Sequence, residues 1–369
     1  MRGDPVTLLL CGDVMLGRGV DQILPHPGDP ALREAYIRDA RVYVELAETM
    51  NGPIPRPADF SWPWGEVLRV AEEAAVDVRV INLETSVTRS GRFAPGKGVH
   101  YRMSPANLPC LLAARPDVCT LANNHVLDFG RQGLRETLDA LAGAGVATAG
   151  AGRNAESARR PAAVPLGADR RVLVFSFGMP SSGVPPDWAA TGDRAGVDFV
   201  AEPSDAAAAE AVDRIRRVKR PGDTVVVSVH WGSNWGYGVH RDQIRFAHAL
   251  VDGGADVVHG HSSHHPRPLE VYRGRLVLYG CGDLVDDYEG ISGHERYRDD
   301  LRLLYLARLE PDGALAGVRM VPLKVRRMRL WHASHEDAAW LCTVLDRVSR
   351  GLGSRVGREP GGALTLRWS

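Results

Sequence analysis

Four histidines fall within seven residues of one another in the segment 257–266, which reads VVHGHSSHHP. The apolar residues that lead into them are typical of the end of a buried strand, and the Ser, His and Pro residues predict a loop. In open α/β folds, ligands bind beyond the carboxyl ends of the strands. Neutral imidazole is a common metal ligand and exchanges protons near neutral pH. The segment therefore predicts a metal or acid–base site, and a polar surface loop is the alternative.

Four further segments carry polar residues directly after an apolar run, so each predicts a functional side chain at the end of a strand. These segments are Cys11-Gly12-Asp13, Asn82-Leu83-Glu84, Asn123-Asn124-His125 and Val229-His230-Trp231-Gly232. Asp13 could be a metal ligand or an ordinary helix N-cap. An Asn carbonyl beside His125 suits a metal ligand next to an acid–base imidazole, and Asp128 could orient that imidazole. A tight turn followed by a helix cap is the alternative for this segment.

Other residues could contact a substrate. Trp231, Trp235 and Tyr237 are separated by glycines, and they predict a shaped aromatic surface that seats a ligand or forms a pocket wall. The basic, glycine-rich loop 92–98 could hold an anionic group or be a surface turn.

Two charged residues complete the set of candidates. Arg18 lies in the loop after the first predicted strand, and we include it among the substrate-binding residues. Asp283 is another carboxylate at the end of an apolar run, and the glycines before it allow a close approach of the backbone.

Apolar runs and helical spacing predict how these residues are positioned. Strands are predicted at 6–11, 78–83, 117–121, 146–149, 171–177, 223–229, 269–272 and 276–279. Helices are predicted at 32–50, 66–75, 133–144, 205–219, 243–251 and 335–348. This alternation is typical of an α/β fold, and residues 301–309 and 315–324 predict antiparallel strands of an outer sheet. We predict a single domain over 1–369, with a helical insertion at about 21–63 and a strand and helix extension at about 300–369.

Composition narrows the class of protein. The 369 residues include 45 Lys and Arg and 45 Asp and Glu, so no net charge points to nucleic acid or an anionic membrane. Five scattered cysteines do not suggest a disulfide framework. The apolar stretch near Met1 is short for a signal peptide, and no run is long enough to cross a bilayer. We therefore expect a cytoplasmic protein with no nucleic-acid or membrane partner.

Five motifs, taken in order, resemble the CapA family within the calcineurin-like metallophosphoesterase superfamily. They are GDVMLGR at 12–18, NLE at 82–84, ANNHVLDFG at 122–130, HWG at 230–232 and GHSSHHP at 260–266. The resemblance runs from about Leu8 to Gly290. It implies an α/β (α+β four-layer) fold, the calcineurin-like αββα sandwich of two mixed β-sheets flanked by helices. The family is associated with poly-γ-glutamate capsule biosynthesis.

The resemblance also implies roles for individual residues. The ligands of one or two divalent ions (Ca, Mn, Mg, Fe or Zn) would be Asp13, Glu84, Asn124, His230 and His261, completed by His264 or His265. His125 matches the acid–base histidine of the family. The phosphoesterase opening motif Asp-x-His reads Asp13-Val14-Met15 here, and methionine is a poor ligand for a hard ion. The first of the two usual metal positions is therefore weakened.

Four functions fit these residues, and the two enzymatic ones other than phosphoester hydrolysis act on a peptide or polyamide substrate. We favour a metal-dependent isomerase that epimerises a peptide α-carbon. Protons would be moved by His125–Asp128 and by a histidine of the 261–265 loop, with His265 as the candidate, paired with Asp13 or Asp283. The alternatives are metal-dependent phosphoester hydrolysis, and poly-γ-glutamate biosynthesis or amide-bond hydrolysis. A carbohydrate- or polyamide-binding module without catalysis is the fourth.

Overall fold

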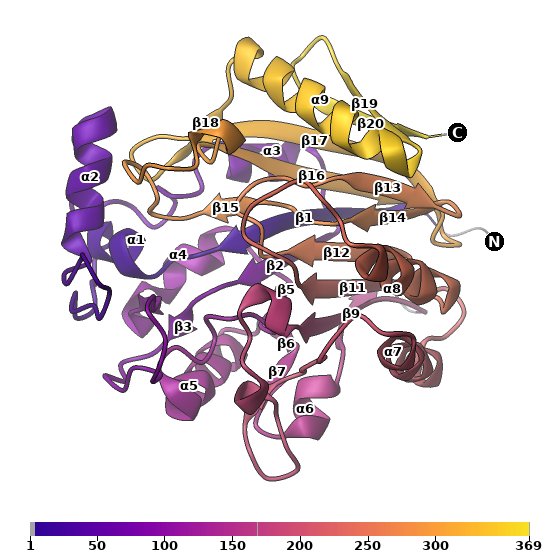
Figure 1. The fold of residues 1–369 in the computed structure, drawn as a ribbon, viewed down its shortest axis with the longest axis horizontal. Coiled ribbons are helices and arrows are strands. Elements are labelled where there is room, and N and C mark those ends of the chain that lie inside the picture. The colour runs from indigo at the N-terminus through magenta and orange to yellow at the C-terminus, as the bar shows by residue number, and fades with distance from the viewer. Residues whose placement is uncertain (1–3, 168, 369) are drawn as a thin grey trace.

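Two large β-sheets face each other, and helices cover their outer faces (Figure 1). The computed structural model describes residues 4–167 and 169–368. Both sheets contain parallel and antiparallel pairs of strands. The predicted four-layer αββα sandwich of two mixed sheets is therefore confirmed.

The first sheet holds the N-terminal and C-terminal strands. Its order is β19 (Ser354–Arg358), β20 (Leu364–Trp368), β17 (Leu315–Val325), β16 (Leu301–Leu309), β1 (Val6–Val14), β2 (Val78–Leu83), β5 (Val118–Thr120) and β6 (Ala147–Ala149). In addition, β15 (Asp283–Val285) pairs with β1, and β18 (Leu330–His332) pairs with β17. Two neighbours of β1, namely β2 and β15, therefore lie beside its carboxyl end, whereas β16 pairs with residues 6–10.

The second sheet is built from the middle of the chain. Its order is β13 (Leu269–Tyr272), β14 (Arg275–Leu278), β12 (Val257–His261), β11 (Thr224–His230), β9 (Arg170–Gly178) and β8 (Ala162–Leu166). Two small sheets pair β3 (Ser86–Val87) with β4 (Arg102–Met103), and β7 (Ala151–Gly152) with β10 (Gly196–Val197). Because β11 and β12 are parallel neighbours, His230 and His261 lie side by side at their ends.

The helices divide between the two outer faces. The first sheet is covered by α1 (Arg18–Ile23), α2 (Arg41–Asn51), α3 (Val67–Glu73), α4 (Leu108–Ala113) and α5 (Gly130–Gly143). The second sheet is covered by α7 (Asp205–Val218) and α8 (Arg241–Asp252). The short α6 (Ala155–Arg159) packs on β7, and α9 (His335–Ser349) packs on β19 near the chain's C-terminus (Figure 1).

Strand alternation explains the three hydrophobic layers. In β1, Leu8 and Leu10 face the second sheet, whereas Leu9 and Cys11 face the helices. In β11, Val226 faces the first sheet, whereas Val225 belongs to the outer core with α7 and α8. Successive side chains of a strand point to opposite faces, so each buried strand contributes to two cores.

Two predicted elements differ from the structure. The helix predicted at 32–50 begins only at Arg41, because Asp39 accepts a hydrogen bond from the Arg41 amide and pairs with Ala31 in an isolated bridge. The strands predicted at 301–309 and 315–324 are antiparallel, but they do not form a separate outer sheet. Instead β16 pairs directly with β1 and extends the first sheet.

A β-bulge in β1 turns Asp13 toward the space between the sheets. Leu10 pairs with Val80 of β2, but Asp13 pairs with Asn82, so β1 has one extra residue between these pairs. A regular strand would point residue 13 toward the helices, because a shift of one residue exchanges the two faces. The bulge contains Gly12, where an added Cβ would lie 1.5 Å from the carbonyl oxygen of Gly282.

We predict that Gly12→Ala lowers the free energy of unfolding by about 1–3 kcal/mol, because the backbone must shift to remove this overlap. Chemical denaturation would measure the loss. Gly317→Ala is the matched control, because Gly317 also lies in a strand of the first sheet and an added Cβ there meets no atom within 4 Å. Equal stability of the two variants would contradict the role given to Gly12.

Candidate metal centre

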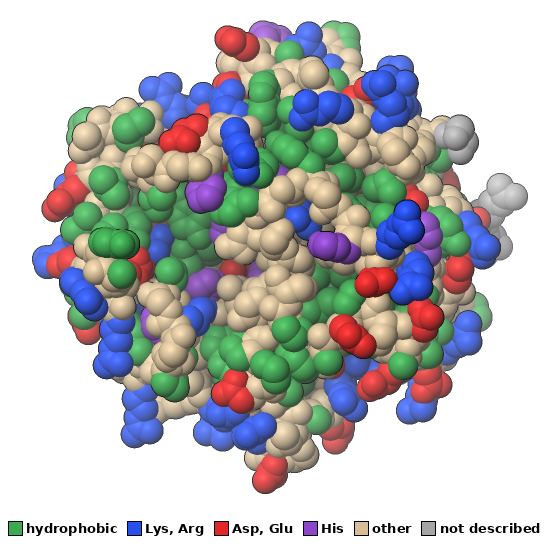
Figure 2. Space-filling model, in the orientation of Figure 1, with side chains coloured by type: hydrophobic (Ala, Val, Ile, Leu, Met, Phe, Trp, Pro, Cys, Tyr) green, Lys and Arg blue, Asp and Glu red, His purple; other side chains and the backbone are tan. Residues whose placement is uncertain are grey.

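The space between the sheets changes from apolar to polar at the carboxyl ends of the strands. Its apolar part includes Leu10, Val80 and Val226. The next positions on the same face carry Asp13 and Asn82 from the first sheet and, from the second, Ser228, His230, His259 and His261, all of them buried. Figure 2 shows a hollow on this side of the molecule in which histidine side chains are visible.

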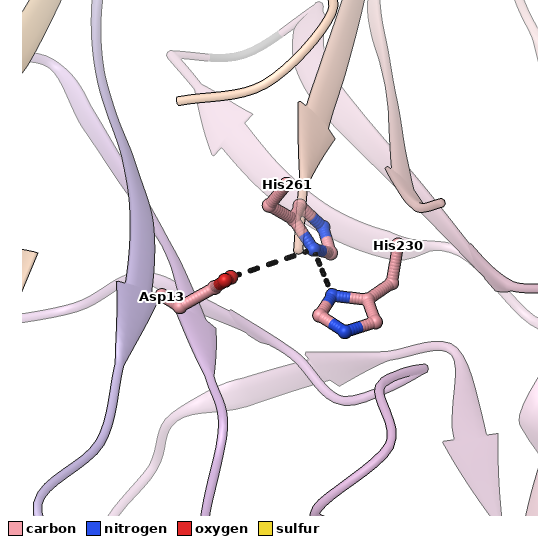
Figure 3. A group of neighbouring side chains, drawn as sticks. All are labelled: Asp13, His230 and His261. Atoms are coloured by element: carbon pink, nitrogen blue, oxygen red, sulfur yellow. Dashed lines mark hydrogen bonds and ion pairs between the residues drawn. The ribbon is translucent and has the colours of Figure 1, made fainter. Parts of the chain in front are cut away.

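Three side chains from both sheets converge at this point. Asp13, His230 and His261 each offer one ligand atom, and the three atoms lie within 4.8 Å of one another (Figure 3). Asp13 Oδ1 lies 3.8 Å from His261 Nδ1. The same carboxylate accepts hydrogen bonds from Asn82 Nδ2, at 2.7 Å, and from the Ser262 amide, at 3.1 Å. These two donors fix its orientation and leave one edge facing the imidazoles.

A hydrogen-bonded chain fixes the tautomer of His261. His259 Nε2 lies 2.7 Å from the Cys11 carbonyl oxygen, which can only accept, so His259 Nε2 carries the proton and its Nδ1 is bare. Ser228 Oγ lies 3.2 Å from that bare Nδ1 and donates its single proton to it. The serine oxygen then accepts from His261 Nε2, 2.7 Å away. His261 Nδ1 therefore presents a lone pair to Asp13 and His230.

The ring nitrogens of His230 and His261 face each other. The Nδ1 of His230 lies 2.7 Å from the bare Nδ1 of His261, and its Nε2 lies 3.0 Å from Asn124 Oδ1 and 3.8 Å from Glu84 Oε1. Burial lowers the pKa of His230 well below 6.5, so the ring is neutral and carries one proton. In the tautomer whose Nε2 donates to Asn124 Oδ1, His230 Nδ1 directs a lone pair at the bare Nδ1 of His261. A cation beside this nitrogen would resolve the conflict.

The kinds of donor atom limit which cation fits. Two imidazoles and a carboxylate suit Mn, Fe or Zn, whereas Ca and Mg prefer a shell of oxygen atoms. Burial, together with the charge of Asp283, raises the pKa of Asp13 to about 7. Burial also raises the pKa of Glu84 well above its usual value. A bound cation would stabilise these carboxylates in their charged form.

His125 forms an oriented pair with Asp128 next to this group. Asp128 Oδ2 lies 2.6 Å from His125 Nδ1 and accepts from the Tyr101 amide at 2.6 Å, while Lys97 Nζ donates to its other oxygen. Burial outweighs the charge of Asp128 and lowers the pKa of His125 to about 4. The imidazole is thus neutral, with its proton on Nδ1. Its bare Nε2 lies 3.7 Å from Glu84 Oε1, so it can accept a proton at the centre.

The last two histidines of the loop are placed differently. His264 Nδ1 lies 3.1 Å from both carboxylate oxygens of Asp283, and Asp283 is paired with Asp13 between β1 and β15. His265 Nδ1 donates to the Pro266 carbonyl, and its Nε2 accepts from the Gly236 amide. The predicted catalytic role of His265 therefore lacks a free nitrogen, whereas His264 stands beside the centre as a paired imidazole.

The four predicted substrate-binding residues are not equivalent. Trp235 and Tyr237 are partly exposed and stack with or pack on His265, so they can form a wall. Trp231 is 1% exposed and donates to the Tyr279 carbonyl inside the outer core of the second sheet, where no substrate reaches it. Arg18 is also buried, and its guanidinium donates to Asp287 and Glu34. The structure thus removes Trp231 and Arg18 from the substrate-binding set.

Several residues of the centre were missed by the sequence analysis as site residues. Asn82 donates to Asp13 and accepts from Asn123 Nδ2 at 3.1 Å, and Lys97 anchors Asp128. Ser228 and His259 set the tautomer of His261. The basic loop 92–98 was the available indication of Lys97, and Ser228 could be found from its place two residues before His230 on the same face of a strand.

The protein is an α/β sandwich of two facing mixed sheets. Its candidate metal site, made of histidines and carboxylates, lies between the sheets at the carboxyl ends of their strands. The chain belongs to the bacterial capsule synthesis protein PGA_cap family, whose sequence profile matches residues 7–288. The predicted resemblance to CapA is thereby confirmed. Among the residues that the structure describes, no helix is long and apolar enough to cross a membrane.

The chain is similar to two named bacterial proteins. A Mycobacterium tuberculosis protein described as a probable polyglutamine synthesis accessory protein is 57% identical over 99% of this chain and 97% of its own length. The PGA biosynthesis protein CapA of Bacillus subtilis is 26% identical over 82% of this chain and 68% of its own. The crystal structure of a 5'-nucleotidase precursor from Thermus thermophilus aligns at 15% identity with a TM-score of 0.48, over 92% of this chain and 59% of that one.

We predict that Ser228→Ala weakens the binding of Mn²⁺ or Zn²⁺ by about 10- to 100-fold, because the tautomer of His261 is no longer fixed. Isothermal titration calorimetry on metal-stripped protein would measure the dissociation constants. Ser176→Ala is the matched control, since Ser176 pairs with Ser228 on the neighbouring strand and its buried hydroxyl has no hydrogen-bond partner among the described residues. Unchanged affinity in Ser228→Ala would contradict the tautomer assignment.

Proposed function

We propose that this chain is a metal-dependent enzyme that acts on the amide bonds of a glutamate-rich polymer during the synthesis of a capsule-type polyamide. The observation that carries the proposal is the convergence of Asp13, His230 and His261, beside which Glu84 Oε1 lies 3.8 Å from His230 Nε2 and 3.7 Å from the bare Nε2 of His125. The family description refers to capsule synthesis, and the names of the relatives from Mycobacterium and Bacillus refer to the synthesis of polyglutamine and of PGA, which supports a polyamide as the substrate.

Each residue of the centre would have a separate role in amide-bond cleavage. A cation held by Asp13, His230 and His261 would supply a Lewis acid that polarises the amide carbonyl. His125 would accept a proton from the attacking water at Nε2 and pass it to the leaving amine. Asp128 would hold the other ring nitrogen and stabilise the imidazolium that forms. In this scheme Asn82 keeps the Asp13 carboxylate turned toward the cation.

This proposal replaces epimerisation, which we favoured from the sequence. The comparisons favour the alternative, since the family and its named relatives are described by polymer synthesis and none by isomerisation. Phosphoester hydrolysis with two metals is disfavoured by Met15, whose sulfur lies in the core 3.6 Å from Tyr288 Oη at the position of the usual histidine. A binding module has no need of the oriented His125–Asp128 pair.

The remaining expectations from the sequence are carried forward as part of the proposal. The substrate is a polyamide rather than a nucleic acid, which agrees with the equal numbers of acidic and basic residues. The cytoplasmic location, the absence of a membrane partner and the single-domain organisation stay predictions.

We predict that the protein loaded with Mn²⁺ or Zn²⁺ shortens poly-γ-glutamate, and that His125→Ala slows this reaction by about 10²- to 10⁴-fold. Chain length by gel filtration and free amines by a colorimetric assay would measure turnover. His335→Ala is the control, because His335 is exposed at the start of α9 and makes no side-chain contact with the centre.

The same incubation in heavy water separates the alternatives. New free amines without deuterium at the α-carbon would support the proposal. Deuterium at the α-carbon without new amines would overturn it in favour of epimerisation, and turnover of an aryl phosphate alone would favour phosphoester hydrolysis. Equal rates in His125→Ala and the parent protein would remove His125 from the mechanism.

A further inference from the structure

Two tyrosine hydroxyls lie next to the metal centre and contact each other. Tyr101 Oη lies 2.9 Å from Tyr288 Oη. The ring of Tyr101 packs edge-on against His125, with 4.5 Å between the ring centroids, and the ring of Tyr288 packs edge-on against His264, at 5.2 Å. The two tyrosines therefore link the two imidazoles of the centre that are each paired with an aspartate.

The acceptors at hand fix the direction of these hydrogen bonds. Tyr101 is fully buried, and its Oη has no partner other than Tyr288 Oη in the part of the chain that the structure describes. Tyr288 Oη also lies 3.6 Å from Met15 Sδ. Only one arrangement therefore gives both protons an acceptor, namely donation from Tyr101 to Tyr288 and from Tyr288 to the sulfur. A thioether is a weak acceptor, so the proton of Tyr288 is available to a better one.

The sulfur occupies the position at which a two-metal phosphoesterase carries a ligand. The motif Asp-x-His reads Asp13-Val14-Met15 in this chain. The Met15 amide donates to the Val285 carbonyl at 2.8 Å, so the pairing of β1 with β15 sets Tyr288 close to Met15. In a two-metal site, the second cation binds oxygens on which charge develops. Here a hydroxyl lies beside the residue that replaces the ligand of such a cation.

Buried ion pairs hold the segment that carries Tyr288. Asp287 accepts from Arg18 Nε at 2.9 Å, and Asp286 accepts from Arg302. All four of these side chains are buried. The Tyr288 amide in turn donates to Asp286 Oδ1 at 3.0 Å. The hydroxyl is thus held in place before a substrate arrives, which an effective donor to a reacting atom requires.

Tyr288 also meets the two other requirements of such a donor, which are access and a retained proton. Its side chain is partly exposed and lines a cavity of about 470 Å³, whereas Tyr101 is buried behind it. Burial, together with the charge of Asp283, raises the pKa of Tyr288 well above its usual value. The hydroxyl therefore stays protonated at neutral pH.

We infer that Tyr288 is a further catalytic residue, whose hydroxyl donates a hydrogen bond to the substrate oxygen that becomes negatively charged during the reaction. When the substrate binds, the proton turns from the Met15 sulfur to this oxygen, which is the stronger acceptor. Donation from Tyr101 polarises the Tyr288 hydroxyl and strengthens it as a donor. The inference rests on the proposed function for the identity of the bond that reacts, but not for the binding of an oxyanion.

Inorganic phosphate, a tetrahedral oxyanion, is the probe for this hydroxyl. Calorimetric titration of the protein loaded with Mn²⁺ or Zn²⁺, after removal of free metal, should give a dissociation constant about tenfold higher in Tyr288→Phe than in the parent protein, because a hydrogen bond to a charged oxygen is lost. Tyr272→Phe is the matched control, since Tyr272 is a partly exposed tyrosine on β13 whose hydroxyl donates to Asp252 at 3.3 Å. Thermal denaturation would show that both variants fold. Equal phosphate affinity in Tyr288→Phe and the parent protein, or no binding by the parent protein, would overturn the inference.

Turnover of poly-γ-glutamate separates the inference from the proposed function. Tyr288→Phe should lower kcat by about 10²-fold and leave KM within about twofold, because the hydrogen bond strengthens only in the transition state. Cleavage by Tyr288→Phe at the rate of the parent protein would overturn the inference and leave the proposed function standing. If the polymer is not cleaved but phosphate binding depends on Tyr288, the proposed function fails and the inference stands.

A double-mutant cycle tests the link between the two hydroxyls. Tyr101→Phe should lower kcat by less than Tyr288→Phe does, and it should add no further loss in the Tyr288→Phe background, because Tyr101 acts through Tyr288. A loss of the same size in both backgrounds would contradict the positioning role of Tyr101.

Discussion

The centre of this protein depends on the close approach of two buried imidazoles, His230 and His261. In the tautomer whose Nε2 donates to Asn124 Oδ1, His230 Nδ1 directs a lone pair at the bare Nδ1 of His261, 2.7 Å away, and burial lowers the pKa of His230. An uncompensated contact of this kind is costly in a medium of low dielectric constant. The arrangement is therefore one that a cation stabilises, and the neighbouring residues are placed as a cation would require.

The fold creates this close approach through strand register. The bulge in β1 turns Asp13 inward, and the parallel pairing of β11 with β12 sets His230 beside His261. The hydrogen bonds that run from His261 through Ser228 and His259 end on the carbonyl of Cys11 in β1. A contact to the first sheet therefore sets the tautomer of a candidate ligand in the second sheet. The candidate metal site therefore forms only when the two sheets pack against each other.

Apolar runs in the sequence predicted the strands that supply the centre, because the carboxyl ends of parallel strands meet at one edge, and the resemblance to the CapA family predicted the sandwich. The sequence did not predict the tautomer chain, since Ser228 acts only through the register of its strand and a contact to the opposite sheet. The position of Trp231 could have been predicted from the sequence. Successive side chains of a strand point to opposite faces, so Trp231 points away from His230 and, like Val229, into the outer core. His264 lies beside the centre and His265 does not, because of the conformation of a loop in which Ser262 has a φ of 102°. The spacing of the histidines in the sequence does not predict this conformation.

The placement of Asp13 on one sheet and of His230 and His261 on the other has a consequence for the folded state itself. An ion bound there ties the two halves of the sandwich together and binds only when they are docked. Binding restricted to the native state adds about 2.7 kcal/mol of stability when the free ion is at about 100 times its dissociation constant. The amount of folded protein in the cell would then follow the supply of the metal.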